Sequence, residues 1–257
     1  VAGDIRISNP DRVIDASTGA TKLDLVRYYE GVAREMLPHL KARPCSLVRA
    51  PSGIGGELFF QKHMENAGIP HLTVLDAALW PEHAALLAVD TAPALIAVAQ
   101  MNTIELHTWN AKVPAIDTPD RMVFDLDPGE GVGFAQVREG AVLARSLLAE
   151  LGLKAWLKTS GGKGLHVVVP IAPKHDSDTV KEFSKQVVEH LARVIPQRFV
   201  AKSGPKNRIG RIFVDYLRNG MGATTVAAFS ARARPGLGVS MTLDWDDLPD
   251  VKSGAQW

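Results

Sequence analysis

The chain has 257 residues, of which 46% are hydrophobic and 22% charged, and its formal net charge is +1. These values are typical of a globular protein with a sizeable core, and the net charge favours no particular partner. The single cysteine, Cys45, excludes an internal disulfide and fits a reducing cytoplasm, where we expect the protein to act. The most apolar window, residues 85–101, is interrupted by Asp90 and Pro93 and is too short to span a bilayer, so no membrane partner is expected.

Helical and strand patterns follow each other irregularly along the chain. Residues 21–40 have apolar side chains at helical spacing, and Thr21 is the expected N-cap. Further helices are expected in pieces over 76–101, then over 134–151 up to Gly152, and over 178–195 with Asp178 as its cap. Strand patterns cover residues 45–50, 57–63, 103–109, 121–127, 154–160, 165–171, 210–218, 224–235 and 239–245.

This order of elements predicts the fold class. Strands adjoin one another as often as they alternate with helices, which favours mixed α/β layers over a regular parallel series of strand-helix-strand units. No long linker divides the chain, so we predict a single domain over residues 1–257. Because the first residue is Val rather than Met, we expect this domain to be a module excised from a longer protein.

Two aspartates end one of the predicted strands. Asp125 and Asp127 lie two residues apart, so they project from the same face, and Pro128-Gly129 ends the strand directly after them. Neighbouring carboxylates repel each other unless a cation lies between them, and a divalent ion with oxygen ligands removes that repulsion. The alternative is a strand that ends at the surface with both acids solvated. The pair alone does not decide between these two interpretations.

A third aspartate lies within another apolar run. Asp215 is surrounded by the apolar residues of the strand expected over 210–218, where an unpaired charge is unusual. If this strand adjoins the one that carries Asp125 and Asp127, three carboxylates converge into a candidate site for two metal ions suited to attack at phosphorus. The sequence leaves open whether the two strands are neighbours.

A glycine-rich turn separates the strands expected over 154–160 and 165–171. It carries Ser160, Lys163 and His166 around three glycines. Glycines let backbone N–H groups turn inward toward an anion, so the turn is a candidate phosphate site. It is not a Walker P-loop, because the spacing differs and a strand follows. An ordinary glycine hairpin is the alternative.

Residues 198–234 form a basic segment with eight Lys or Arg residues and one acid, Asp215. Such a segment suggests an anion site, with a solvated basic loop as the alternative. Arginine side chains suit phosphate oxygens, and the candidates are Arg208, Arg218, Arg232 and Arg234. Arg232 and Arg234 alternate at strand spacing, so both are expected to face one ligand.

Two further positions have side chains suited to nucleic acid. His107 lies among polar neighbours in a predicted strand, where a structural role is the alternative. Phe59 and Phe60 are adjacent, and on a regular strand only one faces the core, so the other is available to stack on a base. Ordinary packing on a two-sided sheet is the alternative. Motifs of zinc proteases, cysteine zinc sites and serine hydrolases do not occur in the sequence.

Three motifs, VFDLDPGEG, TSGGKGLHVVVP and RIFVDYLRN, resemble in their order and spacing those of the archaeo-eukaryotic primase superfamily. The surrounding sequences, among them ISNPDRVID, LFFQKH and IELHTWN, resemble the polymerase module of bacterial DNA ligase D over nearly the whole chain. The resemblance implies a primase-like α/β fold, with two mixed or antiparallel sheets flanked by helices and an RRM-like catalytic core. It also implies a template-dependent nucleotidyltransferase that fills in or extends DNA ends during non-homologous end joining, with a preference for ribonucleotides.

The resemblance further implies roles for individual residues. The catalytic residues, which would bind two Mn²⁺ or Mg²⁺ ions, are Asp125, Asp127 and Asp215. The incoming NTP or dNTP would be bound by His107, Ser160, Lys163, His166, Arg208, Arg218, Arg232 and Arg234. The 5′-phosphate of a gapped or broken DNA and the template would be bound by Asn9, Arg12, Lys22, Phe59 and Phe60. Other members of the family carry Lys where Arg12 stands.

The implied partners are double-stranded DNA ends or gaps with a 5′-phosphate, a ligase module in the same polypeptide, and Ku. Two other functions stay open from the residues alone. A phosphatase of the haloacid dehalogenase type also has D-x-D after an apolar strand, but it normally carries Thr or Val where this chain has Gly129. A non-catalytic module that binds DNA ends is the other alternative, and the presence of all three aspartates argues against it.

Overall fold

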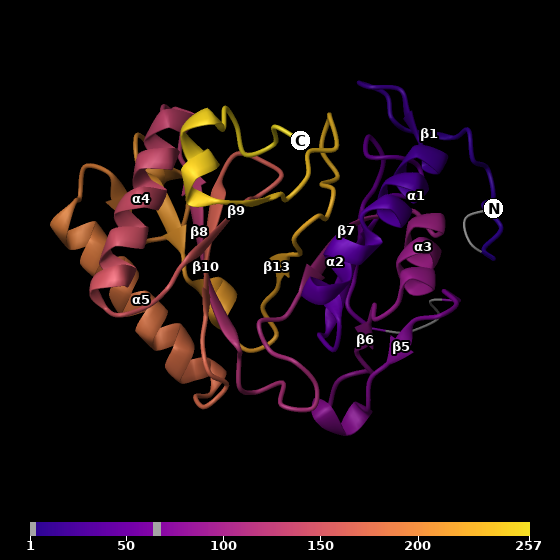
Figure 1. Cartoon of the computed structure of the whole chain (residues 1–257), viewed down its shortest axis with the longest axis horizontal. Coiled ribbons are helices and arrows are strands. Elements are labelled where there is room, and N and C mark those ends of the chain that lie inside the picture. Colours follow the sequence, from indigo (N-terminus) through magenta and orange to yellow (C-terminus); the bar gives the residue numbers. More distant parts are fainter. Residues whose placement is uncertain (1–3, 64–67) are drawn as a thin grey trace. The chain divides into compact units, whose positions relative to one another are not determined.

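The structure is a computed structural model that describes residues 4–63 and 68–257 (Figure 1). The chain forms two compact units, each of which is described by itself. The first unit comprises Val1–Ile116 and Val226–Gly238, and the second comprises Asp117–Thr225 and Val239–Trp257. That residues 1–257 form one functional domain stays a prediction, because a division into two compact units does not test it.

A four-stranded sheet and the helices that cover it form the first unit. The strand order is β13-β7-β3-β4, and β3 pairs antiparallel with both β4 and β7. These strands are β3 (Cys45–Arg49), β4 (Phe59–Gln61), β7 (Thr103–Thr108) and β13 (Thr225–Val226). The helices are α1 (Lys22–Gly31), α2 (Ala33–Leu40), α3 (Ala92–Gln100) and the short 3-10 helix η1 (Ala77–Leu79). Two small sheets pair β1 (Val13–Asp15) with β2 (Ala20–Thr21), and β5 (Thr73–Val74) with β6 (Leu87–Ala88).

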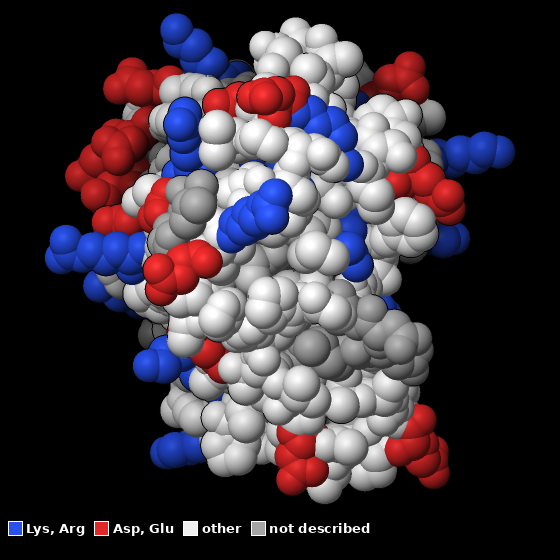
Figure 2. All heavy atoms as spheres, turned by 90° about the vertical axis from the view of Figure 1, so that its right-hand side faces the viewer, with Lys and Arg blue, Asp and Glu red and all other residues white. Residues whose placement is uncertain are grey.

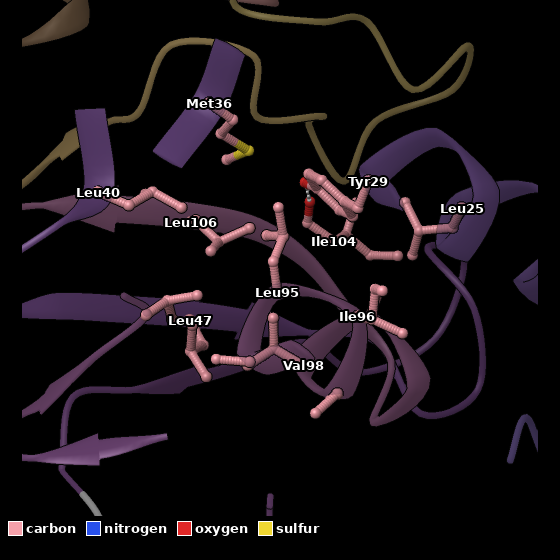
Figure 3. Close-up of a cluster of buried hydrophobic side chains, with 14 of the residues drawn as sticks. Leu25, Tyr29, Met36, Leu40, Leu47, Leu95, Ile96, Val98, Ile104 and Leu106 are labelled. Carbon is pink, nitrogen blue, oxygen red and sulfur yellow. Dashed lines mark hydrogen bonds between the residues drawn. The ribbon is translucent and has the colours of Figure 1, made fainter. Parts of the chain in front are cut away.

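The core of the first unit lies between its helices and the four-stranded sheet (Figure 3). The Tyr29 hydroxyl donates a hydrogen bond to the Ile104 carbonyl, so the one polar atom of this large buried ring is satisfied. The apolar side chains around it come from all three α-helices and from β3 and β7: Leu25, Met36, Leu40, Leu47, Leu95, Ile96, Val98 and Leu106. Burial of each such side chain stabilises the fold by roughly 1.5–3 kcal/mol before entropy is counted.

The helix expected over residues 21–40 begins where the sequence predicts. The Thr21 hydroxyl accepts from the Asp24 backbone N–H, and the Asp24 carboxylate accepts from the Thr21 backbone N–H, which is a complete capping box. The helix is interrupted at Val32, so α1 and α2 are separate elements.

The second unit contains a six-stranded mixed sheet. Its strand order is β11-β12-β8-β10-β9-β14, in which β11 and β12 are parallel and the other pairs are antiparallel. The strands are β8 (Arg121–Pro128), β9 (Trp156–Thr159), β10 (Leu165–Pro170), β11 (Phe199–Val200), β12 (Ile212–Asp215) and β14 (Thr242–Leu243). Its helices are α4 (Phe134–Glu150), α5 (Ser177–Val194) and the 3-10 helices η2 (Pro205–Arg208), η3 (Leu217–Asn219) and η4 (Trp245–Asp250). The predicted mixed α/β fold with mixed and antiparallel sheets is therefore confirmed.

One face of the six-stranded sheet is apolar and is covered by α4 and α5, as Figure 1 shows. Leu126, Leu165 and Val214 lie in this layer together with the buried residues of both helices. Because side chains alternate along a strand, the residues on either side of Leu126 project from the opposite face of the sheet. Those residues are Asp125 and Asp127.

Several element boundaries differ from the expectations. The prediction that Asp178 caps α5 is wrong, because the carboxylate of Asp176 accepts from the Thr179 backbone N–H at 2.7 Å, and Asp178 lies in the first turn. The strand expected over 224–235 is limited to Thr225–Val226. Phe229 has a φ of +66°, and this left-handed residue turns the backbone out of the sheet. The prediction for α4 is confirmed, since Gly152 ends the helix with a φ of +74°.

The surface that carries α3, β5 and β6 is largely uncharged in its lower part (Figure 2). Lys, Arg, Asp and Glu are interspersed over its upper part and at its margins, so neither sign dominates this face. None of the helices described for this chain combines the length and apolar content that crossing a membrane requires.

Candidate functional site

Strand pairing brings the three aspartates to one face of the second unit's sheet. Asp215 of β12 lies directly opposite Asp125 of β8, and Phe213 lies opposite Asp127. Directly opposite residues share a face, as do residues two apart on one strand, so Asp125, Asp127 and Asp215 all project away from α4 and α5. The strands of Asp125 and Asp215, whose adjacency the sequence leaves open, are neighbours.

Each of these carboxylates lies against the side chain of a histidine or an arginine. The contacts are His166 Nε2 to Asp125 Oδ1 at 3.3 Å, Arg208 Nη1 to Asp127 Oδ2 at 3.1 Å, and Arg218 Nε to Asp215 Oδ2 at 3.1 Å. Three of the residues expected at the nucleotide, His166, Arg208 and Arg218, are thus placed directly beside the predicted metal ligands.

Burial and the repulsion between neighbouring carboxylates nevertheless raise the pKa of two of the three aspartates. Burial raises the pKa of Asp127, and the charge of Asp125 raises it further. Burial also raises the pKa of Asp215, with smaller contributions from Asp125 and Asp127. In Asp125 burial is outweighed by the charge and hydrogen bond of His166, and the pKa falls to about 2. Two of the three carboxylates are therefore incompletely compensated by the protein's own cations.

This donor set fits a divalent cation. Three carboxylates on one face offer the hard oxygen ligands that Mg²⁺ and Mn²⁺ prefer, and their mutual repulsion is relieved by added positive charge. Over residues 4–63 and 68–257, no group of three His, Cys, Asp or Glu side chains already surrounds a common point for an ion. The aspartates influence each other's pKa, while their closest oxygen contacts are to His166, Arg208 and Arg218. A bound cation would take over part of that compensation.

The same row of paired residues continues across the sheet to a lysine that the sequence reasoning missed. His166 lies opposite Asp125, and Lys158 lies opposite His166. Lys158 is buried, its Nζ donates to Ser240 Oγ at 2.8 Å, and its charge contributes to the lowered pKa of Asp125. The sequence offers one indication of this role: Lys158 lies two residues before Ser160 in the strand expected over 154–160, so both are expected on the same face.

Hydrogen bonds to Ser160 hold the glycine-rich turn between β9 and β10 together. Ser160 Oγ accepts from the backbone N–H groups of Gly162 and Gly164, each at 3.1 Å. The N–H groups of Gly162 and Gly164, which an anion nest would direct at a phosphate, thus donate to this hydroxyl, and the phosphate site expected in this turn stays a prediction. A Cβ at Gly164 would lie 2.2 Å from the Leu126 carbonyl oxygen, so only glycine lets the turn pack against β8 between the two aspartates.

A hollow of about 700 Å³ opens at the carboxyl end of β8. Lys163 of the glycine-rich turn and Arg208 of η2 both line it. A Cβ at Gly129 would lie 1.7 Å from the Arg208 carbonyl oxygen, so glycine at this position lets the basic loop approach the strand end. Two cations that the sequence places far apart therefore share one hollow next to Asp127.

A second cluster, which we call the Glu105 cluster, lies within the first unit. Glu105 Oε2 lies 2.6 Å from His107 Nε2 and 3.1 Å from Arg232 Nε, and Glu105 Oε1 accepts from the Ala233 N–H at 2.7 Å. Burial raises the pKa of Glu105, but the hydrogen bond from His107 and the charge of Arg232 outweigh it, and the pKa falls to about 2. The sequence reasoning missed Glu105, although it lies two residues before His107 and so shares its face of β7.

Arg232 and Arg234 do not alternate on one strand as expected, so strand spacing does not place Arg234 in the Glu105 cluster. The strand expected there is wrong, because residues 232–235 form a turn in which the Arg234 N–H donates to the Arg232 carbonyl at 2.8 Å. Pro235 and Gly236 follow directly and favour the turn. Arg232 therefore has the closer structural link to His107.

Arg12 and Lys22, expected at a 5′-phosphate, lie close together in the first unit. The Lys22 N–H donates to the Arg12 carbonyl at 2.9 Å, and the Arg12 N–H donates to the Asn9 carbonyl at 3.2 Å. Burial and then the charge of Arg12 lower the pKa of Lys22. Lys22 Nζ donates to the Ser8 carbonyl and hydroxyl oxygens, and Arg12 Nη2 donates to Asn102 Oδ1, while within the described residues the buried Arg12 Nε has no hydrogen-bond partner. Two neighbouring cations whose partners are neutral oxygens fit an anion.

Phe59 and Phe60 lie on the edge strand β4. Each side chain is half exposed, at 50%, so the expectation that one of the two rings faces the core is wrong, and both rings reach the surface. The Phe60 ring contacts His107 edge-on, with 6.0 Å between the ring centroids. The aromatic pair is thus available to contact a ligand, in line with the stacking interpretation.

Three comparisons with known proteins agree with one another. Residues 21–257 match the family described as LigD, primase-polymerase domain. The multifunctional non-homologous end joining protein LigD of Pseudomonas aeruginosa is 50% identical over 253 residues, which are 98% of this chain and 30% of that protein. The corresponding DNA repair protein of Mycobacterium tuberculosis H37Rv is 34% identical over 254 residues, which cover 96% of this chain and 34% of that protein.

The solved structures include the polymerase domain from Mycobacterium tuberculosis ligase D in complex with DNA. It has a TM-score of 0.89 and 33% identity to this chain, and the match covers 96% of this chain and 88% of that one. The chain thus corresponds to nearly all of a solved polymerase domain, while it spans about a third of the two full-length relatives.

Proposed function

The chain belongs to the LigD primase-polymerase domain family, and we propose that it is a template-dependent nucleotidyltransferase that fills in or extends DNA ends in non-homologous end joining. The observation that carries the proposal is the placement of Asp125, Asp127 and Asp215 on one face of a sheet, beside a hollow lined by two cations. Carboxylates that attract divalent cations and adjacent cations that attract phosphates are the two requirements of nucleotidyl transfer.

The three aspartates would hold the divalent cations, either Mn²⁺ or Mg²⁺. When bound, these cations lower the pKa of the attacking hydroxyl and neutralise charge on the phosphates. His166 holds Asp125 in its ionised form, as the lowered pKa indicates. Arg218 orients the carboxylate of Asp215, whose other oxygen accepts from the Leu217 N–H at 2.8 Å.

The incoming triphosphate would enter the hollow at the end of β8. Lys163 and Arg208 line that hollow and supply positive charge, and Ser160 orders the turn that carries Lys163. Positioning and charge neutralisation of this kind account for most of the catalysis in phosphoryl transfer. Within the first unit, the residues proposed for nucleotide binding are His107 and Arg232.

DNA recognition would rest on Arg12, Lys22 and the two phenylalanines. The two cations lie together, and their hydrogen-bond partners among the described residues are neutral oxygens, which suits a terminal phosphate. Phe59 and Phe60 are half exposed and suit stacking on template bases. A ligase module in the same polypeptide belongs to this proposal as well, supported by the names and length of the relatives. The preference for ribonucleotides and the partner Ku belong to it as what the family resemblance implies.

Primer extension on a gapped duplex tests the proposal. The substrate carries a primer 3′-hydroxyl and a downstream 5′-phosphate, and each NTP or dNTP is supplied with Mn²⁺ or Mg²⁺. We expect addition of the nucleotide complementary to the template, faster with ribonucleotides and faster when the downstream 5′-phosphate is present. Absence of extension with every metal and nucleotide would contradict the proposal and favour a non-catalytic DNA-end binding module. The haloacid dehalogenase alternative has no support from the family match.

A further inference from the structure

Glu105 is a buried carboxylate whose two oxygens are both used. It lies in the interior of β7, and its side chain is only 8% exposed. Oε2 faces His107 and Arg232, and Oε1 accepts from the backbone N–H of Ala233. Burying a carboxylate costs free energy unless its partners compensate the charge, so these contacts offset the burial of Glu105.

The partners of Glu105 come from two distant parts of the chain. His107 lies on the same strand, whereas Arg232 and Ala233 belong to the segment that returns to the first unit at Val226. That segment also joins β7 through the Ala227 N–H, which donates to the Leu106 carbonyl at 2.8 Å. Beyond β13, which ends at Val226, residues 227–238 contain no further strand. Glu105 therefore supplies side-chain contacts to a segment that lacks a continuous strand ladder.

The contacts of Glu105 also determine how the His107 ring is held. Nε2 lies at 2.6 Å from the carboxylate, and the ring meets the edge of Phe60 at 6.0 Å between centroids. Two contacts from different directions restrict both rotation and tilt of the imidazole. Because the ring and the guanidinium share Oε2, a shift of either one changes the position of the other.

We propose that Glu105 is a positioning residue for nucleotide binding: it orients His107 and Arg232 as one preformed pair and ties the 226–238 segment to β7. The proposal rests on the proposed function, in which His107 and Arg232 contact the incoming nucleoside triphosphate. Glu105 itself is an anion and is not a contact for phosphate. Its role is to hold the imidazole and the guanidinium at a defined separation before the nucleotide arrives, so that little ordering is needed on binding.

The test compares the full chain with Glu105→Gln and with the control Glu30→Gln, an exposed glutamate on α1 in the same unit. Gln keeps the size of the side chain but has one acceptor oxygen and no charge. In primer extension we expect the KM for the nucleotide to rise about tenfold in Glu105→Gln, with a smaller change in kcat, because orientation of the binding groups is lost. Affinity for the 5′-phosphorylated duplex is expected to stay unchanged, and Glu30→Gln is expected to match the wild type.

A mutant cycle separates positioning from a general effect on the fold. If Glu105 acts through His107 and Arg232, the KM of Glu105→Gln/His107→Ala/Arg232→Ala should equal that of His107→Ala/Arg232→Ala within about twofold. A further multiplicative loss from Glu105→Gln in that background would overturn the proposal. An unchanged KM in Glu105→Gln would overturn it as well, while leaving the proposed function intact, since the wild-type protein would still extend the primer.

Glu105→Asp provides the second variant if Glu105→Gln does not fold. It keeps the charge that compensates Arg232 but withdraws the carboxylate by one methylene from its three partners. We expect this variant to fold, with a far-UV circular dichroism spectrum like that of the wild type, and to show the same rise in the nucleotide KM. A folded Glu105→Asp with the wild-type KM would contradict the positioning role.

Discussion

Two clusters of this chain combine carboxylates with histidine and arginine, but they differ in how far the charge of the carboxylates is compensated. In the second unit three carboxylates share one face of a sheet, and the pKa values of Asp127 and Asp215 are raised by burial and by neighbouring carboxylates. In the first unit one carboxylate meets a histidine, an arginine and a backbone N–H, and the pKa of Glu105 falls to about 2. In the second unit, burial and the neighbouring carboxylates outweigh the nearby cations at Asp127 and Asp215, whereas in the Glu105 cluster both carboxylate oxygens have partners.

This difference indicates different tasks. A cluster in which buried carboxylates repel one another gains stability when a divalent cation is added, so it is suited to bind one. A carboxylate that is fully compensated gains nothing from a cation and instead fixes the groups around it. We therefore propose catalysis for Asp125, Asp127 and Asp215, and positioning for Glu105. The following predictions test that division, beginning with the largest expected effect.

Asp127→Asn is expected to reduce nucleotide addition by about a thousandfold or more, because a metal ligand at the reacting phosphate is lost. Affinity for the 5′-phosphorylated duplex should change little. The measurements are single-nucleotide primer extension and fluorescence anisotropy with labelled DNA. Glu189→Gln, an exposed acid on α5, is the matched control. A normal extension rate in Asp127→Asn would show that the metal assignment is wrong.

Arg12→Ala/Lys22→Ala is expected to weaken binding of 5′-phosphorylated gapped DNA by about tenfold or more, because two charge-assisted phosphate contacts are removed. Binding of the same duplex with a 5′-hydroxyl should fall far less. Anisotropy titrations at two salt concentrations measure both affinities. Equal loss on the two substrates would indicate general electrostatic attraction in place of phosphate recognition.

Glu105→Gln is expected to lower the free energy of unfolding at neutral pH by roughly 1–3 kcal/mol, since the carboxylate is buried and ion-paired. The folded pKa of about 2 lies below the ordinary value of 4.5, so the stabilisation is present above that ordinary value and is lost as the pH falls toward 2. The difference between wild type and variant should therefore shrink in acid, as measured by urea unfolding at several pH values. A difference that stays constant down to pH ~3 would contradict the ion-pair account.

Asp215→Asn is expected to have the smallest and opposite effect on stability. A carboxyl whose folded pKa is raised loses stability as the pH rises through that pKa, so Asp215 weakens the fold at neutral pH in metal-free buffer. Replacing it with the neutral amide should raise the Tm by about 2–4 °C, which corresponds to roughly 1 kcal/mol for a chain of this size. Thermal unfolding of both proteins in EDTA measures this, and a lower Tm in the variant would show that Arg218 compensates Asp215 fully.

Local spacing accounts for what the sequence predicted well. Asp125 and Asp127 share a face because strands have a period of two, and Thr21 caps α1 because its side chain reaches the N–H three residues later. The contacts that were missed are formed by residues distant in sequence. Glu105 and Ala233 are separated by 128 residues, so no local sequence pattern predicts the hydrogen bond between them.

Errors at element ends have a similar origin. Asp176 and Asp178 are both reasonable caps, and the choice between them depends on which carboxylate reaches the Thr179 N–H. The strand expected over 224–235 reads as alternating, but the left-handed Phe229 and the turn before Pro235 end it early. Tertiary packing thus overrides a pattern that is locally consistent with a strand.

The most direct test of the division between the clusters is a Mn²⁺ titration followed by electron paramagnetic resonance of the free ion. Wild-type protein, Asp127→Asn and Glu105→Gln are compared without DNA or nucleotide. We expect saturable binding in the wild type, the same affinity in Glu105→Gln, and at least about tenfold weaker binding in Asp127→Asn. Wild-type affinity in Asp127→Asn, or a loss confined to Glu105→Gln, would contradict the assignment of the divalent cation site to the three aspartates.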